Sequence, residues 1–151
     1  MKRAIVLMNM GGPNNIGEVK VFLRNITSPY ELVDSVKGKI DSLTFSNLLT
    51  FRNAPTGKYY IVVKNFNSIE TWSRDGGDSL IRGGLNNNYD FTDSASKAYG
   101  SNLKLKGSKY CLISGNVKQD YTIDASDISA VENDVLEGVT GYVSTDLNGD
   151  S

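Results

Sequence analysis

The stretch Lys58-Tyr-Tyr-Ile-Val-Val-Lys64 constrains the fold of this chain more than any other segment. Its aromatic and β-branched residues favour extended backbone, because such side chains pack well on a pleated surface. The turn-forming cluster Asn53-Ala-Pro-Thr-Gly57 stands directly before it. The sequence therefore predicts a core β-strand that is entered from a tight turn.

Shorter segments of the same kind recur along the chain, separated by residues typical of turns. Short strands at fairly regular spacing predict a mainly β fold, an antiparallel β-sandwich. A short helix over Ile16 to Leu23 is an alternative to the strand predicted over Val19–Arg24. The further predicted strands are Ala4–Met8, Val19–Arg24, Tyr30–Val36, Ser42–Phe45, Leu48–Phe51, Ser68–Trp72, Ser79–Arg82, Tyr89–Phe91, Leu103–Lys106 and Lys109–Ile113.

The pattern changes near the C-terminal end of the chain. Apolar residues between Asp127 and Glu137 recur at helical spacing, Ser126 is a suitable N-cap, and Gly138 is a suitable stop. We therefore expect a short loop–helix segment after the sandwich.

The loop before this helix has the oxygen pattern of a calcium loop. Asparagine, aspartate and threonine fall at positions 1, 5, 7, 9 and 12 of residues 116–127, with position 7 offering its backbone carbonyl. Lys118 at position 3 and Tyr121 at position 6 depart from the pattern, since position 6 is normally a glycine with positive φ. The alternative is a polar loop that caps a helix. The predicted calcium ligands are Asn116, Asp120, Thr122, Asp124, Asp127 and, in a second acidic fragment, Asp146, Asn148 and Asp150.

Charge is distributed unevenly along the chain. Residues 110–151 carry one lysine and eight acids, a net charge of −7, whereas residues 1–109 carry 15 basic and 9 acidic residues, a net charge of +6. The acidic part is either a solvated tail or a cation-binding tail whose self-repulsion the ion relieves. Because the whole chain has a net charge of −1, we expect no general attraction to nucleic acid or to a membrane.

Several kinds of chemistry find no support in the residues. The chain has no histidine and one cysteine, Cys111, so an intramolecular disulfide is excluded, and we find no nucleophile–base motif. No apolar run reaches the length of a membrane span, and Met1-Lys-Arg3 opens no convincing signal peptide. We therefore expect a protein that is not an enzyme. Aromatic residues could stack a sugar ring or simply belong to the core, namely Trp72, Tyr59, Tyr60 and Tyr89.

Residues 110–150 resemble a dockerin-type pair of calcium-loop repeats. The stretch Ser114-Gly-Asn-Val-Lys-Gln-Asp-Tyr-Thr-Ile-Asp-Ala-Ser-Asp127 is similar to a degenerate first copy, and Thr145-Asp-Leu-Asn-Gly-Asp150 to the start of a second. The resemblance implies calcium ligation by the residues named above. It also implies docking of a protein partner through the helix.

Residues 19–114 resemble a β-sandwich module that precedes such repeats in secreted bacterial surface proteins. Pro55-Thr-Gly57-Lys-Tyr59 is similar to the hairpin of prealbumin-like and carboxypeptidase-regulatory-like sandwiches. Gly57 would make the turn and Tyr59 would begin a core strand. An ordinary hairpin in another β fold is the alternative. The resemblance implies an extracellular or cell-surface location.

The N-terminal residues resemble a different family. Lys2-Arg-Ala-Ile-Val-Leu-Met-Asn-Met-Gly-Gly-Pro13, followed by Glu18-Val-Lys-Val-Phe-Leu-Arg-Asn25, is similar to the start of ferrochelatase. In that family the segment is the first strand of an α/β domain. Metal insertion there uses a histidine, which this chain lacks. The mixture of resemblances indicates a chimeric sequence in which the sandwich dominates the fold.

These observations lead to one organisation and one leading function. We expect a ferrochelatase-like strand and loop over 1–18 that can add to the sheet, a β-sandwich over 19–114, and a degenerate dockerin-like segment over 115–151. The leading prediction is an extracellular accessory or adhesion module, with a weak calcium-binding tail that docks a protein. The alternatives are an inactive ferrochelatase-like fragment and a carbohydrate-binding sandwich.

Overall fold

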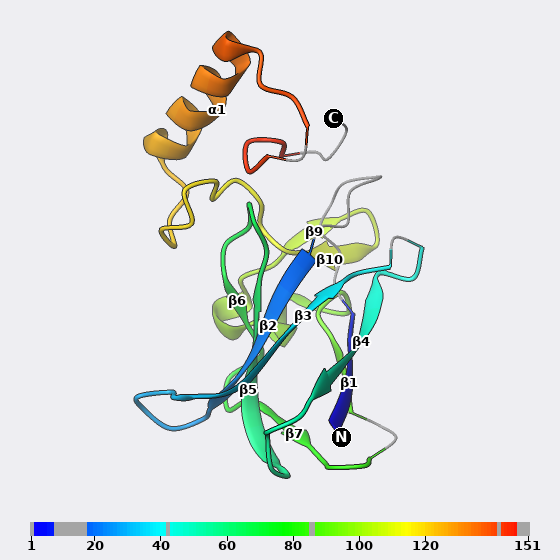
Figure 1. Ribbon diagram of the computed structural model, residues 1–151. Coiled ribbons are helices and arrows are strands. Elements are labelled where there is room, and N and C mark those ends of the chain that lie inside the picture. Colours follow the sequence, from blue (N-terminus) through cyan, green and yellow to red (C-terminus); the bar gives the residue numbers. More distant parts are fainter. Residues whose placement is uncertain (1, 8–17, 42, 85–86, 142, 148–151) are drawn as a thin grey trace.

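The fold is mainly β, with antiparallel sheets and one C-terminal helix, as the sequence predicts (Figure 1). The computed structural model describes residues 2–7, 18–41, 43–84, 87–141 and 143–147, and of residues 2–7 it describes the backbone. No helix in these ranges is both long and apolar enough to cross a membrane.

The larger sheet has five strands in the order β3-β2-β5-β6, with β7 paired to the other half of β5. All of its pairs are antiparallel. Its strands are β2 (Glu18–Asn25), β3 (Leu32–Lys39), β5 (Gly57–Lys64), β6 (Thr71–Trp72) and β7 (Asp78–Leu80). The predicted strand over Lys58–Lys64 is therefore confirmed, and it lies between β2 and β6.

The second sheet has three strands in the order β4-β1-β8, and a separate hairpin joins β9 to β10. β1 pairs antiparallel with β4 and parallel with β8, so it is the central strand. The predicted N-terminal strand thus joins the sheet, although Met8 lies outside the described residues. These strands are β1 (Lys2–Leu7), β4 (Ser46–Phe51), β8 (Asn88–Asp90), β9 (Lys104–Lys106) and β10 (Lys109–Cys111).

The core fills the space between the inner faces of the two sheets. Along β2, Val19, Val21 and Leu23 have no exposed surface, whereas the intervening residues face outward. This alternation is expected of a strand with one buried face, since successive side chains point to opposite sides. Further core residues from both sheets and their connections are Leu49, Phe51, Tyr59, Ile61, Val63, Leu80, Tyr89, Phe91, Leu103 and Leu112.

The predicted hairpin motif is present, but its glycine acts differently from the prediction. Gly57 is the first residue of β5 and has no positive φ. A Cβ at this position would lie 3.0 Å from the Tyr59 hydroxyl, so a larger residue here would press against the Tyr59 ring. The same hydroxyl donates to the Pro55 carbonyl at 2.8 Å. Tyr59 itself is 4% exposed and begins the core part of the strand, as predicted.

One strand prediction is wrong because local hydrogen bonds favour a turn, and another is confirmed only in part. In the Ser42–Phe45 segment, Leu43 and Thr44 donate their amides to the Asp41 carboxylate, and Phe45 donates to the Asp41 carbonyl. Ser42 lies outside the described residues. The segment predicted from Ser68 is a strand only at its end, in β6. The helix considered up to Leu23 is also wrong, because β2 occupies that region.

The C-terminal part of the chain leaves the sandwich. After two short 3₁₀ turns, η1 (Ala95–Lys97) and η2 (Tyr99–Ser101), and the hairpin, a loop leads to helix α1 (Ala125–Glu137). Figure 1 shows α1 standing clear of both sheets, with the following segment folding back toward them. Gly138 ends the helix in the left-handed conformation with φ 66°, as predicted for a stop signal.

Candidate functional site

The loop that carries the predicted calcium ligands begins on the sandwich. Ile69 donates its amide to the Ile113 carbonyl at 2.9 Å, and Gly115 donates to the Asn67 carbonyl at 2.8 Å. The Gln119 side chain donates to the Ser68 carbonyl at 3.4 Å. The edge segment after β5 therefore fixes the position of the loop.

Asn116, at position 1 of the loop, is 2% exposed. Its side-chain oxygen accepts a hydrogen bond from the Asp120 amide at 3.2 Å, and its carbonyl accepts one from Gln119 at 2.8 Å. Asp120 in turn accepts from the amide and the hydroxyl of Thr122, at 3.2 and 3.0 Å. The structure thus brings positions 1, 5 and 7 together through a chain of short contacts.

Asp127, at position 12, closes the loop. It is 2% exposed, and its two carboxylate oxygens accept from the Lys118 amide at 3.1 Å and from the Asp124 amide at 3.0 Å. The Asp124 carboxylate in turn accepts a hydrogen bond from the Ser126 amide, at 2.8 Å, in the first turn of the helix. The two aspartates form a capping box.

This capping box corrects the predicted N-cap. Asp124 has extended backbone, with φ −141° and ψ −170°, and its side chain reaches the first helical amides. Ser126 already lies inside the first turn, so it cannot cap the helix. An aspartate two residues before the predicted cap was the signal in the sequence.

The hydrogen bonds of the capping box also determine the charge of the loop. Bonds from Ser126 lower the pKa of the Asp124 carboxyl, and the amides of Asp124 and Lys118 lower the pKa of the Asp127 carboxyl. The positive charge of Lys118 contributes in the same direction at both aspartates. Both groups are consequently held in their charged form.

The backbone of the loop takes the sharp turn despite the missing glycine. Tyr121, at position 6, has φ 73°, and Gln119, at position 4, has φ 59°. Non-glycine residues pay roughly 1–2 kcal/mol for left-handed backbone. The hydrogen bonds around Asn116 and Asp120 hold this conformation.

Of the ligands predicted for a second loop, the structure describes Asp146. The Asp146 carbonyl accepts from the Asn67 side chain at 3.0 Å, which ties this segment to the sandwich. Asn148 and Asp150 lie outside the described residues. Within the described ranges, no group of three or more acidic, cysteine or histidine side chains is placed to hold a metal ion. An ion in the first loop would therefore need the Asn116 amide oxygen and backbone carbonyls as well.

Helix α1 exposes apolar side chains. Ile128, Val135 and Leu136 are 59%, 73% and 84% exposed, and the buried side chain of the helix is that of Asp127. An apolar hollow of about 300 Å³ lies beside the helix. It is lined by Gly115, Ile123, Asp127, Ile128, Val131, Glu132 and Leu147.

The aromatic residues singled out in the sequence divide into two groups. Tyr59 and Tyr89, 4% and 2% exposed, belong to the core. Tyr60 and Trp72 lie on the outer face of the larger sheet, where their ring centroids are 5.4 Å apart. Tyr30 and Tyr99 join them there. The sequence analysis did not predict these last two, because they come from a turn and a 3₁₀ segment.

Comparison with known proteins gives one partial match. A stretch of 50 residues is 44% identical to a ferrochelatase from Sulfurimonas denitrificans. The aligned part is 33% of this chain and 16% of that protein, so the chain spans about a sixth of the relative that it matches. No family model matches the chain, and no solved structure matches it. The ferrochelatase resemblance of one segment is thus supported, whereas the dockerin-type and prealbumin-like resemblances gain no support and stay predictions.

Proposed function

We propose that this protein is a non-enzymatic, extracellular accessory or adhesion module. Its C-terminal segment would be a degenerate, dockerin-like calcium loop that presents helix α1 to a protein partner. The observation that carries the proposal is the left-handed backbone of Tyr121, with φ 73°, inside a loop closed by Asp127. The loop keeps the turn that calcium loops need, although the residue that normally permits it is absent.

The loop has oxygen atoms to offer a calcium ion. A carboxylate oxygen has two lone pairs, so Asp127 can accept an amide hydrogen and still ligate a cation. Asp120 engages one of its oxygens with Thr122, and the other has no partner among the described residues. Lys118 opposes binding, because its charge acts on both Asp124 and Asp127. These features favour weak binding of a hard cation.

The partner-docking part of the proposal rests on helix α1. A helix normally buries one apolar stripe against its neighbours, but Val135 and Leu136 are more than two thirds exposed. Contiguous exposed apolar surface marks interaction sites. A protein partner with an apolar surface would cover these side chains.

A ferrochelatase-like role has narrower support. It rests on the partial match of 50 residues. The larger sheet is antiparallel throughout, and the chain has no histidine. We therefore give the accessory-module proposal precedence.

Calorimetric titration with calcium tests the proposal. We expect weak heat from the native chain and tighter binding by the double variant Lys118→Asp with Tyr121→Gly, which restores an oxygen ligand and the glycine. Lys104→Asp with Tyr110→Gly, two residues of the hairpin, is the matched control and should leave the calcium signal unchanged.

A thermal melt gives the second readout. Calcium at about 100 times its dissociation constant adds about 2.7 kcal/mol to the stability of the form that binds it. A restored variant that shows neither heat nor a shifted melt in millimolar calcium would refute the calcium loop.

A further inference from the structure

We propose that the outer face of the five-stranded sheet binds an acidic polysaccharide. One sugar ring would occupy an aromatic pocket beside the middle of β5, and carboxylate or sulfate groups of neighbouring sugars would lie on a row of lysines. This site does not involve helix α1, although Lys64 at one end of the row contacts the Tyr121 ring in the loop before that helix.

The aromatic pocket is formed by four side chains, Tyr30, Tyr60, Trp72 and Tyr99, and has a volume of about 330 Å³. The rings meet edge to face, with Tyr30 and Trp72 at 5.9 Å and 84°. Tyr99 lies 6.3 Å from Tyr60 at 80°. Tyr30 and Tyr99 are 41% and 55% exposed. A pocket of this size is at the lower end of the range for small-molecule sites, which suits a single ring.

The pocket is held in shape before any ligand arrives. The Tyr60 hydroxyl donates to Asp75 at 3.2 Å and accepts from the Gly76 amide at 3.2 Å. The Trp72 indole donates to Glu70 at 2.8 Å. Rings fixed in this way lose little conformational entropy on binding.

Tyr30 reaches the pocket through constrained backbone. Tyr30 has φ 57°, and its carbonyl accepts from the Arg24 guanidinium at 3.1 Å. Strained backbone of this kind concentrates at functional sites.

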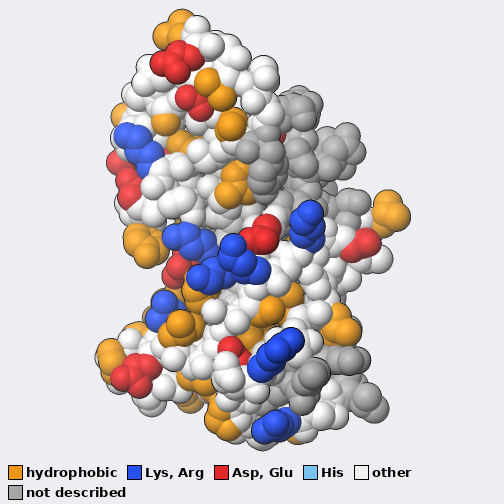
Figure 2. All heavy atoms as spheres, in the orientation of Figure 1, with side chains coloured by type: hydrophobic (Ala, Val, Ile, Leu, Met, Phe, Trp, Pro, Cys, Tyr) orange, Lys and Arg blue, Asp and Glu red, His pale blue; other side chains and the backbone are white. Residues whose placement is uncertain are grey.

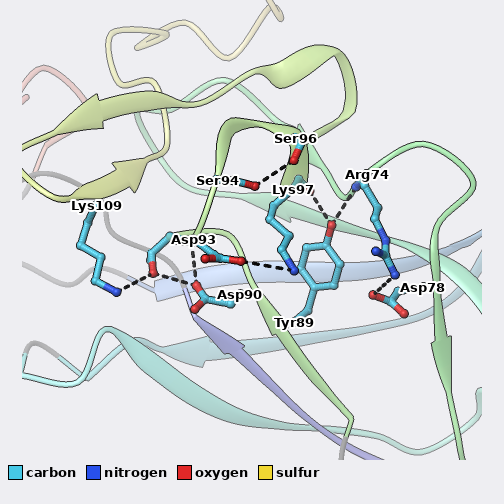
Figure 3. Close-up of polar contacts among 10 residues, drawn as sticks. Arg74, Asp78, Tyr89, Asp90, Asp93, Ser94, Ser96, Lys97 and Lys109 are labelled. Carbon is cyan, nitrogen blue, oxygen red and sulfur yellow. Dashed lines mark hydrogen bonds and ion pairs between the residues drawn. The ribbon is translucent and has the colours of Figure 1, made fainter.

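The turn that carries Tyr99 is tied down by the core residue Tyr89. Its hydroxyl donates to the Lys97 carbonyl and accepts from the Arg74 amide (Figure 3). Lys97 also pairs with Asp93 at 3.7 Å. The Tyr89 hydroxyl therefore holds the turn two residues before Tyr99.

A row of cations lies on the same face. Lys20 of β2 is opposite Lys37 of β3 and opposite Lys64 of β5, so three lysines stand side by side across three strands. Arg24, four residue pairs further along, is opposite Tyr60 of the pocket. Figure 2 shows Lys and Arg side chains gathered across the middle of this view.

The row is only partly neutralised. Within the described part of the chain, Lys37 has a carboxylate partner, Glu18, at 2.6 Å. Lys20 lies over the Phe22 ring at 4.9 Å and Lys64 over the Tyr121 ring at 5.6 Å. Like charges directly opposite one another destabilise a sheet, so a polyanion bound along the row would relieve this repulsion.

The groups around the pocket suit the uncharged part of a sugar. Glu70 and Asp75, which hold the pocket rings, can accept hydrogen bonds from sugar hydroxyls, whereas acidic groups of the ligand would lie away from them, on the row of lysines. Arg24 lies 5.7 Å from the Trp72 ring, which disfavours a cationic ligand. Aromatic rings, acceptors and nearby cations together match a sugar that carries both hydroxyl and acidic groups.

Titration of the full chain with polysaccharides tests the proposal. The probes are polygalacturonate for carboxylate, dextran sulfate for sulfate, neutral dextran and an oligothymidylate, followed by Trp72 fluorescence and calorimetry at two salt concentrations. We expect binding of one or both acidic polysaccharides, weaker at high salt, and weak or no binding of dextran. The preferred acidic probe identifies the anionic group.

Two variants test the contributions of the aromatic pocket and of the lysine row to binding separately. Tyr99→Ala removes an exposed ring and should weaken binding about tenfold, whereas Leu105→Ala, 54% exposed on the hairpin, should not. Lys20→Gln with Lys64→Gln should reduce the salt dependence, because Lys37 and Arg24 remain, whereas Lys104→Gln should leave it unchanged. Absence of binding to both acidic polysaccharides, equal affinity for dextran, or tighter binding of oligothymidylate would each overturn the proposal.

Discussion

The sandwich and the loop–helix tail of residues 115–147 are stabilised in different ways. In the sandwich, side chains such as Val21, Ile61 and Val63 are at most 1% exposed and fill the space between two sheets. In the tail, Leu136 is 84% exposed, and hydrogen bonds to Asp127 and Asp124 define the structure. One region is held by apolar burial and the other by capping and turn contacts.

This difference indicates which region is stabilised by contacts within the chain. Burial of apolar area is the dominant favourable contribution to folding, and the sandwich has that burial within the chain. The tail orders one loop and one helix while leaving Ile128, Val135 and Leu136 largely exposed. A short isolated helix is marginal in water, so the tail depends on its caps, on its attachment at Asn67 and Ser68, and on whatever binds it.

The largest expected effect is a core truncation. Ile61→Ala removes a side chain that is 1% exposed and should lower the free energy of unfolding by about 2–5 kcal/mol. Leu136→Ala, the matched change in the tail, should alter it by less than about 0.5 kcal/mol. Urea denaturation followed by Trp72 fluorescence measures both. Equal effects of the two substitutions would contradict the difference between the regions.

Gly77 offers a second way to break the sandwich. Its φ is 68°, and a Cβ would lie 2.5 Å from the Tyr59 carbonyl oxygen. Gly77→Ala should destabilise by more than the roughly 1–2 kcal/mol of left-handed backbone alone. Gly83, with φ 77° and open space around it, is the control, and Gly83→Ala should cost only the backbone part. If the two variants melt at the same temperature, the close approach at Gly77 does not affect the free energy of unfolding.

A substitution in the capping box should have a smaller effect, confined to helix α1. Asp127→Asn removes the charge and replaces one of the two oxygens that accept the Lys118 and Asp124 amides. The helical circular dichroism signal at 222 nm should fall, and the sandwich transition should stay where it is. Glu132→Gln, an exposed change on the same helix, is the control. A shifted sandwich transition would mean that the two regions unfold together.

Acid should loosen the tail in the same way. The pKa values of Asp124 and Asp127 are lowered below 3.8 by hydrogen bonds, so their contribution to stability is complete above pH 3.8 and is lost as the pH falls through the folded-state values. The helical signal of the native chain should therefore decrease below about pH 4 and converge on that of Asp127→Asn. A constant difference between the two proteins down to pH 2 would contradict this.

Several elements could be predicted from local residue patterns alone. The strand β5 follows from its aromatic and β-branched residues, and the helix end follows from Gly138, because both signals act over a few neighbouring residues. The hydrogen-bonded positions of the loop, Asn116, Asp120 and Asp127, also follow from spacing.

Other features depend on contacts between distant segments and could not be predicted in this way. Tyr30 and Tyr99 lie in the same pocket only because a turn and a 3₁₀ segment meet over β5. The row of Lys20, Lys37 and Lys64 requires the register of three strands. The turn at Asp41 had a local signal, an aspartate three residues before a threonine, that competes with strand formation.

Hydrogen exchange of backbone amides, with and without calcium, tests the central claim most directly. We predict that amides of β2 and β5 exchange slowly in both conditions, that α1 exchanges much faster without calcium, and that calcium slows exchange within residues 116–137. Exchange of α1 at the same slow rate as β5, unchanged by calcium, would contradict the claim that the tail is a separately stabilised, calcium-responsive element.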